Sequence, residues 1–382
     1  MVGFPKKLQL KLTEREGNNA LRRLPVPNDL VDFSSNDYLG FSGKVAIFRA
    51  ASELLARRDL YGNGSTGSRL LTGNSVLYAE LESFLTEYFN TEAALVFNSG
   101  YDANIGFFSA VPQRGDIILY DELCHASIRD GIGMGLAKGY KFKHNDLGGL
   151  SEKIVHARNN QGDSDIYVVT ESVFSMDGDI PDLKALADIC ESENCYLVVD
   201  EAHAVGVFGD RGAGWISKAG VQQRVFARII TFGKAMGCHG AAILGSETLK
   251  SYLVNYARSF IYTTAMPPHS LSSVIAAFNY MSSSTKEQDR LRENIVFFNE
   301  QLNAHNLDPY FIPSNSAIHC CVVEGNKKVK QYSKSLFENG FDVKPILSPT
   351  VPVGRERLRF CLHSFNTKKE IAQVLTILSN LL

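Results

Sequence analysis

The chain has 382 residues, of which 45% are hydrophobic and 21% charged, and its formal net charge is −2. This is the composition of an ordinary globular protein, long enough for one large domain and a smaller one. The balanced charge argues against nucleic acid or an anionic membrane as a partner. No apolar run approaches the roughly 18 residues of a spanning helix, and the charged first residues do not resemble a signal peptide.

The cysteines are scattered and odd in number. They are Cys124, Cys190, Cys195, Cys238, Cys320, Cys321 and Cys361. Because no C-x-x-C pair occurs, the pattern favours free thiols in a reducing compartment over a disulfide framework or a zinc site. We therefore expect a cytoplasmic protein.

Residues 1–45 are predicted to form an N-terminal arm with a helical pattern over 8–24, which Pro25 and Pro27 interrupt. From 46 to 284, short apolar strands alternate with helical patterns. The predicted strands are 93–98, 116–121, 165–172, 195–203, 227–233 and 241–245. This alternation predicts an α/β domain whose mostly parallel central sheet is flanked by helices.

Residues 285–382 show a different pattern. A long helix is predicted over 286–305, strands within 317–325 and 357–363, and an amphipathic helix over 367–382. These residues are expected to form a smaller α+β domain.

Ligands of open α/β sheets collect beyond the carboxyl ends of the strands. The strand before His203 ends in Asp200. Burying an acid there is costly without a partner, so Asp200 either caps the next helix or pairs with a cationic ring nitrogen.

The strand at 227–233 delivers Thr231 and, in the following turn, Lys234. Lys234 is either an exposed loop residue or a lysine in a glycine-lined pocket. Partial burial disfavours the ammonium form, and a neutral amine is what Schiff-base chemistry requires.

Two further strands end in polar turns. Asn98, Ser99 and Gly100 precede a helix opening near Tyr101, and such a helix start either is simply capped or binds a phosphate. His125 either packs in the core or covers a flat ligand. A phosphate, a carbonyl that reacts with lysine, a protonated ring nitrogen and a flat ring together describe pyridoxal 5'-phosphate.

Two other interpretations are open to the same residues. Gly62, Gly64 and Gly67 form G-x-G-x-x-G, but the preceding segment is charged and helical rather than a strand, which argues against a dinucleotide site. A metal site of His125, Asp200 and His203 leaves Lys234 without a role, so we expect no metal.

Several longer motifs occur in one order along the chain. They are FSSNDYLGFSG, GSTGSRLLTGN, FNSGYDAN, ESVFSMDGDIPDL, VVDEAHAVGVFGDRGAG, TFGKAMGCHGAAILG and IYTTAMPP. Together, from about Arg22 to the C-terminus, they resemble the α-oxoamine synthases, which are fold-type I pyridoxal-phosphate enzymes. The resemblance implies an acyltransferase that condenses an amino acid with an acyl thioester and releases carbon dioxide.

The resemblance also implies roles for individual residues. The implied cofactor ligands are Tyr101, Asp102, His125, Ser175, Asp200, His203, Thr231, Lys234 and Thr263. Among them Lys234, Asp200, His125 and His203 are the implied catalytic residues, with Lys234 bound to the cofactor aldehyde and later acting as the base. Thr263 is implied to reach the phosphate of a neighbouring subunit, which makes the protein a homodimer with shared sites.

The substrate ligands implied in the same way are Arg359 for a carboxylate, Asn36 close to it and Arg22 at the acyl end. Within the family the motifs are most similar to members that join L-alanine to a pimeloyl thioester, carried by coenzyme A or an acyl carrier protein. The alternatives are members that use glycine with acetyl or succinyl thioesters, or serine with a palmitoyl thioester. A catalytically silent subunit is a further alternative, against which the presence of all four catalytic residues argues.

Overall fold

The protein is described by a computed structural model that covers residues 3–161 and 164–382. Its contacts divide the chain into two compact units. The large unit comprises residues 36–175 and 180–289, and the small unit comprises the residues up to 35, 176–179 and 290–382. The domain boundaries expected after residues 45 and 284 stay predictions.

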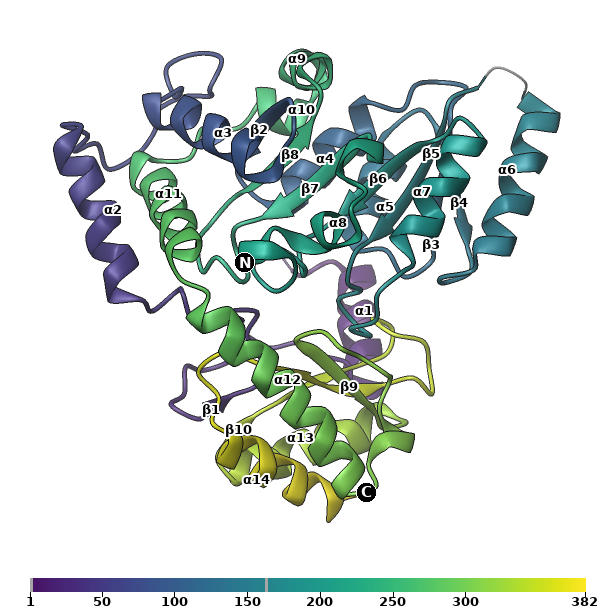
Figure 1. Cartoon of the computed structure of the whole chain (residues 1–382). Helices are drawn as coiled ribbons and strands as arrows, with labels where there is room; N and C mark the ends of the chain where they lie inside the picture. The colour runs from purple at the N-terminus through teal and green to yellow at the C-terminus, as the bar shows by residue number, and fades with distance from the viewer. Residues whose placement is uncertain (1–2, 162–163) are drawn as a thin grey trace. The chain divides into compact units, whose positions relative to one another are not determined.

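The large unit is built on a seven-stranded sheet with the order β2-β8-β7-β6-β5-β3-β4 (Figure 1). Its strands are β2 (Ala93–Phe97), β3 (Ile117–Asp121), β4 (Lys138–Phe142), β5 (Ile166–Glu171), β6 (Tyr196–Asp200), β7 (Ala227–Thr231) and β8 (Ala241–Gly245). Strand β8 is antiparallel to both of its neighbours, and the other adjacent pairs are parallel. The predicted α/β fold with a mostly parallel sheet is confirmed.

Strand β4 was not predicted from the sequence. It reads KGYKF, and four of its five residues are exposed at the edge of the sheet. An edge strand does not need the apolar run that marks a central strand, and lysines on it discourage pairing with another chain. The other six strands lie within the predicted segments because they are buried on both faces.

Side chains of the strands point alternately to two helical layers. One layer contains α4 (Gly100–Ala110), α5 (Ala126–Met134) and α9 (Glu247–Tyr256), which pack with Ile118 and Val198. The other contains α6 (Leu147–Gln161), α7 (Leu183–Ser192) and α8 (Gly214–Ala219), which pack with Leu119 and Val199. The remaining helices of the unit are α2 (Val45–Arg57), α3 (Val76–Phe89), α10 (Arg258–Ile261) and α11 (Pro268–Ser283), with 3-10 turns at Asp210–Gly212 and Gln222–Arg224.

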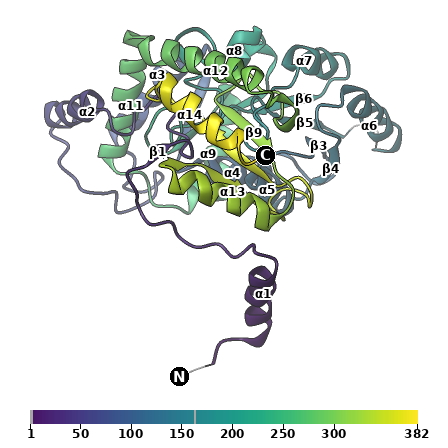
Figure 2. The same cartoon turned by 90° about the horizontal axis from the view of Figure 1, so that it is seen from below.

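The small unit contains an antiparallel sheet in the order β11-β12-β9 and a short parallel pair of β1 with β10. These strands are β1 (Val31–Asp32), β9 (Ile318–Val322), β10 (Phe341–Asp342), β11 (Lys344–Ile346) and β12 (Arg357–Cys361). Helices α13 (Asn326–Glu338) and α14 (Lys368–Ser379) gather on one side of the sheet with α12 (Lys286–Ala304), whose first residues belong to the large unit (Figure 2). A 3-10 turn covers Asp308–Tyr310.

The first helix is shorter than its sequence pattern predicted. Helix α1 (Lys6–Gly17) stops well before residue 24. The backbone of Asn18 bonds back to Glu14, and Asn19 adopts a left-handed φ of 52°. Asparagine tolerates this conformation, which ends a helix, so the expectation of a helix over 8–24 was wrong at its C-terminal end.

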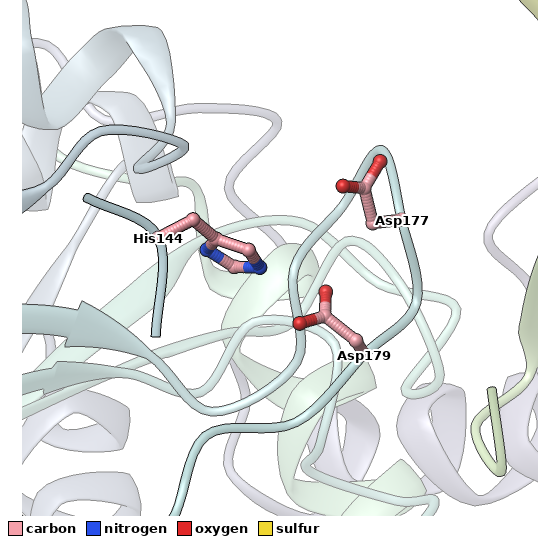
Figure 3. A group of neighbouring side chains, drawn as sticks. All are labelled: His144, Asp177 and Asp179. Carbon is pink, nitrogen blue, oxygen red and sulfur yellow. The ribbon is translucent and has the colours of Figure 1, made fainter. Parts of the chain in front are cut away.

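The loop at 176–179 belongs to the small unit although it follows a strand of the large sheet. Buried Arg357 on β12 pairs with the carboxylate of Asp177 and donates to the carbonyl of Met176 at 2.9 Å. Asp177 and Asp179 of this loop are drawn in Figure 3. His144, also drawn there, belongs to the large unit, where its Nδ1 lies 2.9 Å from Asp121 Oδ1.

In the part of the chain that the structure describes, the cysteines form no disulfide bond, in line with the predicted thiols. Within residues 3–161 and 164–382, no helix combines the length and the hydrophobicity required to cross a membrane.

The core of the small unit contains a buried histidine. His319 on β9 is 1% exposed, and its ring centre lies 4.5 Å from that of Phe298. In the described part of the chain neither of its ring nitrogens has a hydrogen-bond partner. Burial lowers the pKa of His319 to about 3, because the charged ring would lose its hydration in the core.

This histidine makes stability depend on pH. Below its ordinary pKa of 6.5 the unfolded chain binds a proton at His319 that the folded chain does not, so stability falls as the pH falls. Between pH 8 and pH 5, we expect the free energy of unfolding of wild type to fall by about 2 kcal/mol more than that of His319→Leu, measured by denaturant unfolding. His156→Leu, at an exposed position, is the control. Parallel pH dependences of wild type and His319→Leu would contradict this prediction.

Candidate active site

The carboxyl ends of the central strands bring the predicted residues to one edge of the large sheet. Asp200 ends β6, and Thr231 ends β7, with Lys234 in the turn that follows. Glu171 ends β5 and is paired in register with Asp200. This is the edge where an open α/β sheet binds its ligand.

Lys234 contacts His203 directly. Its Nζ lies 2.7 Å from His203 Nε2, and on the other side of the imidazole Nδ1 lies 2.6 Å from the hydroxyl of Tyr38. His203 is 5% exposed and Tyr38 fully buried. The lysine is therefore not an exposed loop residue, because its amine contacts the buried His203, which in turn contacts the buried Tyr38.

Asp200 is held by two N–H donors. Asn104 Nδ2 donates to Oδ2 and the backbone of Ala202 donates to Oδ1, both at 2.9 Å. The same Asn104 amide donates to Ser127 Oγ at 3.0 Å, and that hydroxyl lies 2.7 Å from His125 Nδ1. Asp200 and His125 are thus connected by a chain of side chains, and the carboxylate is oriented by groups that the sequence analysis did not identify.

Glu171 is the second buried acid of the site. It is 3% exposed, and its Oε1 accepts the backbone N–H of His125 at 2.5 Å. Burial, together with the charge of Asp200, raises the pKa of Glu171 to about 8. Burial also lowers the pKa of His125, and the charge of Lys234 acts in the same direction. The charge of Asp200 opposes the shift of the His125 pKa without reversing it, so burial favours the uncharged forms of both Glu171 and His125.

The start of α4 forms a cradle with Thr231. Ser99 caps the helix by accepting the Asp102 N–H at 3.0 Å, which leaves the N–H groups of Gly100 and Tyr101 at the helix start. A Cβ on Gly100 would lie 3.6 Å from Thr231 Oγ1. The exposed Tyr101 side chain turns away and donates to Asp130 at 2.9 Å.

Within this chain, Thr263 lies beside Asn98, the residue that follows the end of β2. Its hydroxyl accepts from Asn98 Nδ2 at 3.0 Å. Its expected contact with the phosphate of a neighbouring subunit stays a prediction. Ser175 is buried in the segment after β5 and belongs to the large unit.

The predicted substrate ligands are divided between the units. Asn36 belongs to the large unit and accepts the hydroxyl of Tyr38 at 3.1 Å. Arg359 is buried on β12 of the small unit, where Nη1 lies 2.9 Å from Cys361 Sγ. The exposed Arg22, also in the small unit, donates to Thr350 Oγ1 at 3.1 Å. The roles of the two arginines toward a substrate stay predictions.

The glycine motif at Gly62, Gly64 and Gly67 follows helix α2 and lies in a loop. A dinucleotide site requires a strand before this motif, so the argument against such a site is supported.

Sequence reasoning missed Tyr38, Asn104, Ser127 and Glu171. Glu171 had a usable signal, because it is an acid at the end of an apolar strand, which is the criterion that identified Asp200. The other three carry no such mark. Tyr38 and Asn104 reach His203 and Asp200 only because the fold brings distant segments together, whereas Ser127 lies two residues after His125.

Comparison with known proteins establishes the class of the chain. It belongs to the aminotransferase class I and II family, whose sequence profile matches residues 28–378. A relative named 8-amino-7-oxononanoate synthase, from Emericella nidulans, is 40% identical over 380 residues, which cover 95% of this chain and 92% of the relative.

Solved structures agree with this result. An 8-amino-7-oxononanoate synthase from Francisella tularensis is 31% identical with a TM-score of 0.78, covering 93% of this chain and 98% of its own. A serine palmitoyltransferase from Sphingomonas wittichii is 26% identical with a TM-score of 0.90, covering 100% and 98%. The resemblance to the α-oxoamine synthases and the fold-type I assignment are confirmed.

The protonated state of Glu171 can be tested by Glu171→Gln. The unfolded chain loses this proton above the ordinary pKa of 4.5, whereas the folded chain keeps it up to about pH 8, so the acid costs stability as the pH rises. Between pH 5 and 8, we expect the free energy of unfolding of Glu171→Gln to rise relative to that of wild type by up to about 1.4 kcal/mol per pH unit. The measurement is denaturant unfolding of the cofactor-free protein.

The matched control is Glu82→Gln. Glu82 is also buried but is paired with Arg69 at 2.6 Å and Lys250 at 3.0 Å, so its neutral amide should destabilise the protein. A pH-independent difference between Glu171→Gln and wild type would show that Glu171 is ionised in the folded protein.

Proposed function

We propose that this chain is a pyridoxal-phosphate-dependent acyltransferase that joins L-alanine to a pimeloyl thioester. The products are 8-amino-7-oxononanoate, carbon dioxide and the free thiol, which is a step of biotin biosynthesis. The observation that carries the proposal is the contact of Lys234 with His203 beside buried Asp200, at the ligand-binding edge of the sheet. The 40% identity to a relative that bears the corresponding enzyme name supports the substrate assignment.

The residues fit the proposed cofactor. The cradle of Gly100, Tyr101 and Thr231 offers N–H and hydroxyl donors to a phosphate. Asp200 offers a buried carboxylate to a protonated ring nitrogen, and His125 offers a neutral flat ring. Pyridoxal 5'-phosphate supplies an electron-withdrawing ring that takes up the electron pair released when an amino acid loses its α-proton or its carboxylate.

Each residue has a distinct task in this proposal. Lys234 would hold the cofactor through its Nζ and would accept the α-proton of the amino acid at the same atom. His203, which contacts Lys234, would also contact the ring hydroxyl, with Ser175 nearby. Asp200 keeps the ring nitrogen protonated, and Asn104 orients Asp200.

The substrate is held by the predicted polar residues. Arg359 binds the carboxylate of alanine, because a guanidinium grips a carboxylate with two parallel hydrogen bonds. Asn36 lies close to it, and Arg22 contacts the acyl end. We also propose that the protein is a cytoplasmic homodimer in which Thr263 completes the partner's site.

The decisive experiment is an amino-acid screen with the cofactor-loaded enzyme. We expect L-alanine to change the visible absorbance and, when pimeloyl-CoA or a pimeloyl-loaded acyl carrier protein is added, release of carbon dioxide and free thiol in equal amounts. Glycine or serine should give less than about a tenth of this rate. A preference for serine or glycine would assign the chain to another α-oxoamine synthase reaction.

Lys234→Ala is the chemical control for this screen. We expect it to lack the absorbance of the lysine-bound cofactor and to lose at least about 1,000-fold in turnover, because both the covalent link and the base are removed. Full activity of this variant would overturn the mechanism while leaving the fold assignment intact.

The shared site predicts complementation between variants. Lys234→Ala and Thr263→Val are each expected to be impaired, the second through roughly tenfold weaker cofactor binding. When the two are mixed and allowed to exchange subunits, a hybrid dimer has one site with both residues intact. Activity above the mean of the two parents supports sharing, and activity equal to that mean would place both residues in one subunit's site.

A further inference from the structure

Tyr38 has no role in the function proposed above. Its hydroxyl nevertheless lies in the middle of a chain of polar contacts that runs from Asn36 through Tyr38 and His203 to Lys234. The side chain is fully buried, and its hydroxyl contacts both Asn36 Oδ1 at 3.1 Å and His203 Nδ1 at 2.6 Å. The two aromatic rings are 6.1 Å apart and tilted by 50°. The hydroxyl of Tyr38 thus connects its ring to His203 through a polar contact.

The protons in this chain of polar contacts can be assigned one after another, starting from Tyr38. A phenol has one proton, and Tyr38 donates it to Asn36 Oδ1. The short contact with His203 therefore requires a hydrogen on Nδ1. A neutral imidazole protonated at Nδ1 has a lone pair at Nε2, which is the atom 2.7 Å from Lys234 Nζ.

We propose that Tyr38 is a positioning residue that holds His203 in the Nδ1–H tautomer, so that Nε2 always accepts from the amine of Lys234. The inference rests on the proposed function for its catalytic meaning. When Lys234 accepts the α-proton of the amino acid, the ammonium finds an acceptor already oriented toward it. The opposite tautomer would direct an N–H at Lys234 and oppose that proton transfer.

The tautomer can be measured without cofactor or substrate. In cofactor-free protein labelled with ¹⁵N-histidine, His203 is assigned by the signal that disappears in His203→Gln. We expect Nδ1 to be the protonated nitrogen in wild type and Nε2–H to become populated in Tyr38→Phe, which keeps the buried ring but removes the acceptor. Nε2–H in wild type, or an unchanged tautomer in Tyr38→Phe, would overturn the proposal.

A second variant protects the test against a folding defect. Asn36→Leu removes the acceptor of the Tyr38 proton, which frees the hydroxyl to donate to His203 Nδ1. The same shift toward Nε2–H is therefore expected in Asn36→Leu, although its tyrosine is intact. An unshifted tautomer in this variant would also count against the proposal.

The kinetic consequence is measured by exchange of the α-proton of L-alanine with deuterated solvent on the loaded enzyme. We expect Tyr38→Phe to slow exchange roughly 10- to 100-fold with little change in KM for alanine. Tyr167→Phe, at another buried tyrosine far along the sheet, should alter neither quantity. A changed tautomer with wild-type exchange would overturn the catalytic part. Absence of exchange in wild type would instead overturn the proposed function, while the tautomer measurement would still decide how Tyr38 acts on His203.

Discussion

The register of β5 against β6 is the constraint on which the site depends. It pairs Glu171 with Asp200, so two carboxyl groups that are 3% and 7% exposed lie side by side. Two neighbouring acids in a medium of low polarity cannot both ionise at an acceptable cost. Both oxygens of Asp200 accept N–H groups, and Glu171 keeps its proton up to a pKa of about 8. A protonated Glu171 therefore adds no second negative charge beside the carboxyl group of Asp200, which is the group proposed to pair with a protonated ring nitrogen.

The hydrogen bonds around Asp200 explain how the site stays ordered. Asn104 connects Asp200 to Ser127 and, through it, to His125, while Glu171 holds the backbone of His125. These groups lie at strand ends or within helices that pack on the sheet, except His125, which caps the start of α5. A displaced donor or acceptor of this buried network would lose its partner without gaining water, which favours one geometry. Asn104 Oδ1 is the exception, because it has no hydrogen-bond partner in the part of the chain that the structure describes. The orientation of these polar groups is therefore set by the fold.

The sequence predicted the part of this arrangement that depends on local chemistry. Central strands are marked by apolar runs, and the polar residues close behind those runs include Asp200, His203 and Lys234. Edge strand β4 and the end of α1 were not predicted correctly, because neither is marked by an apolar pattern. Tyr38 escaped for a different reason. It lies 165 positions from His203, and no spacing rule relates residues that meet only after the sheet has formed.

The approach of Tyr38 to His203 depends in turn on a residue without a side chain. Gly237 closes the turn that carries Lys234, with a φ of 61° and an N–H that donates to the Lys234 carbonyl at 2.8 Å. A Cβ at this position would come 2.6 Å from the carbonyl carbon of Phe41. Any larger residue would therefore push away the backbone shortly after Tyr38, in addition to straining the turn. A larger residue at position 237 would therefore disturb both the turn that carries Lys234 and the backbone that follows Tyr38, the residue that we propose to orient His203.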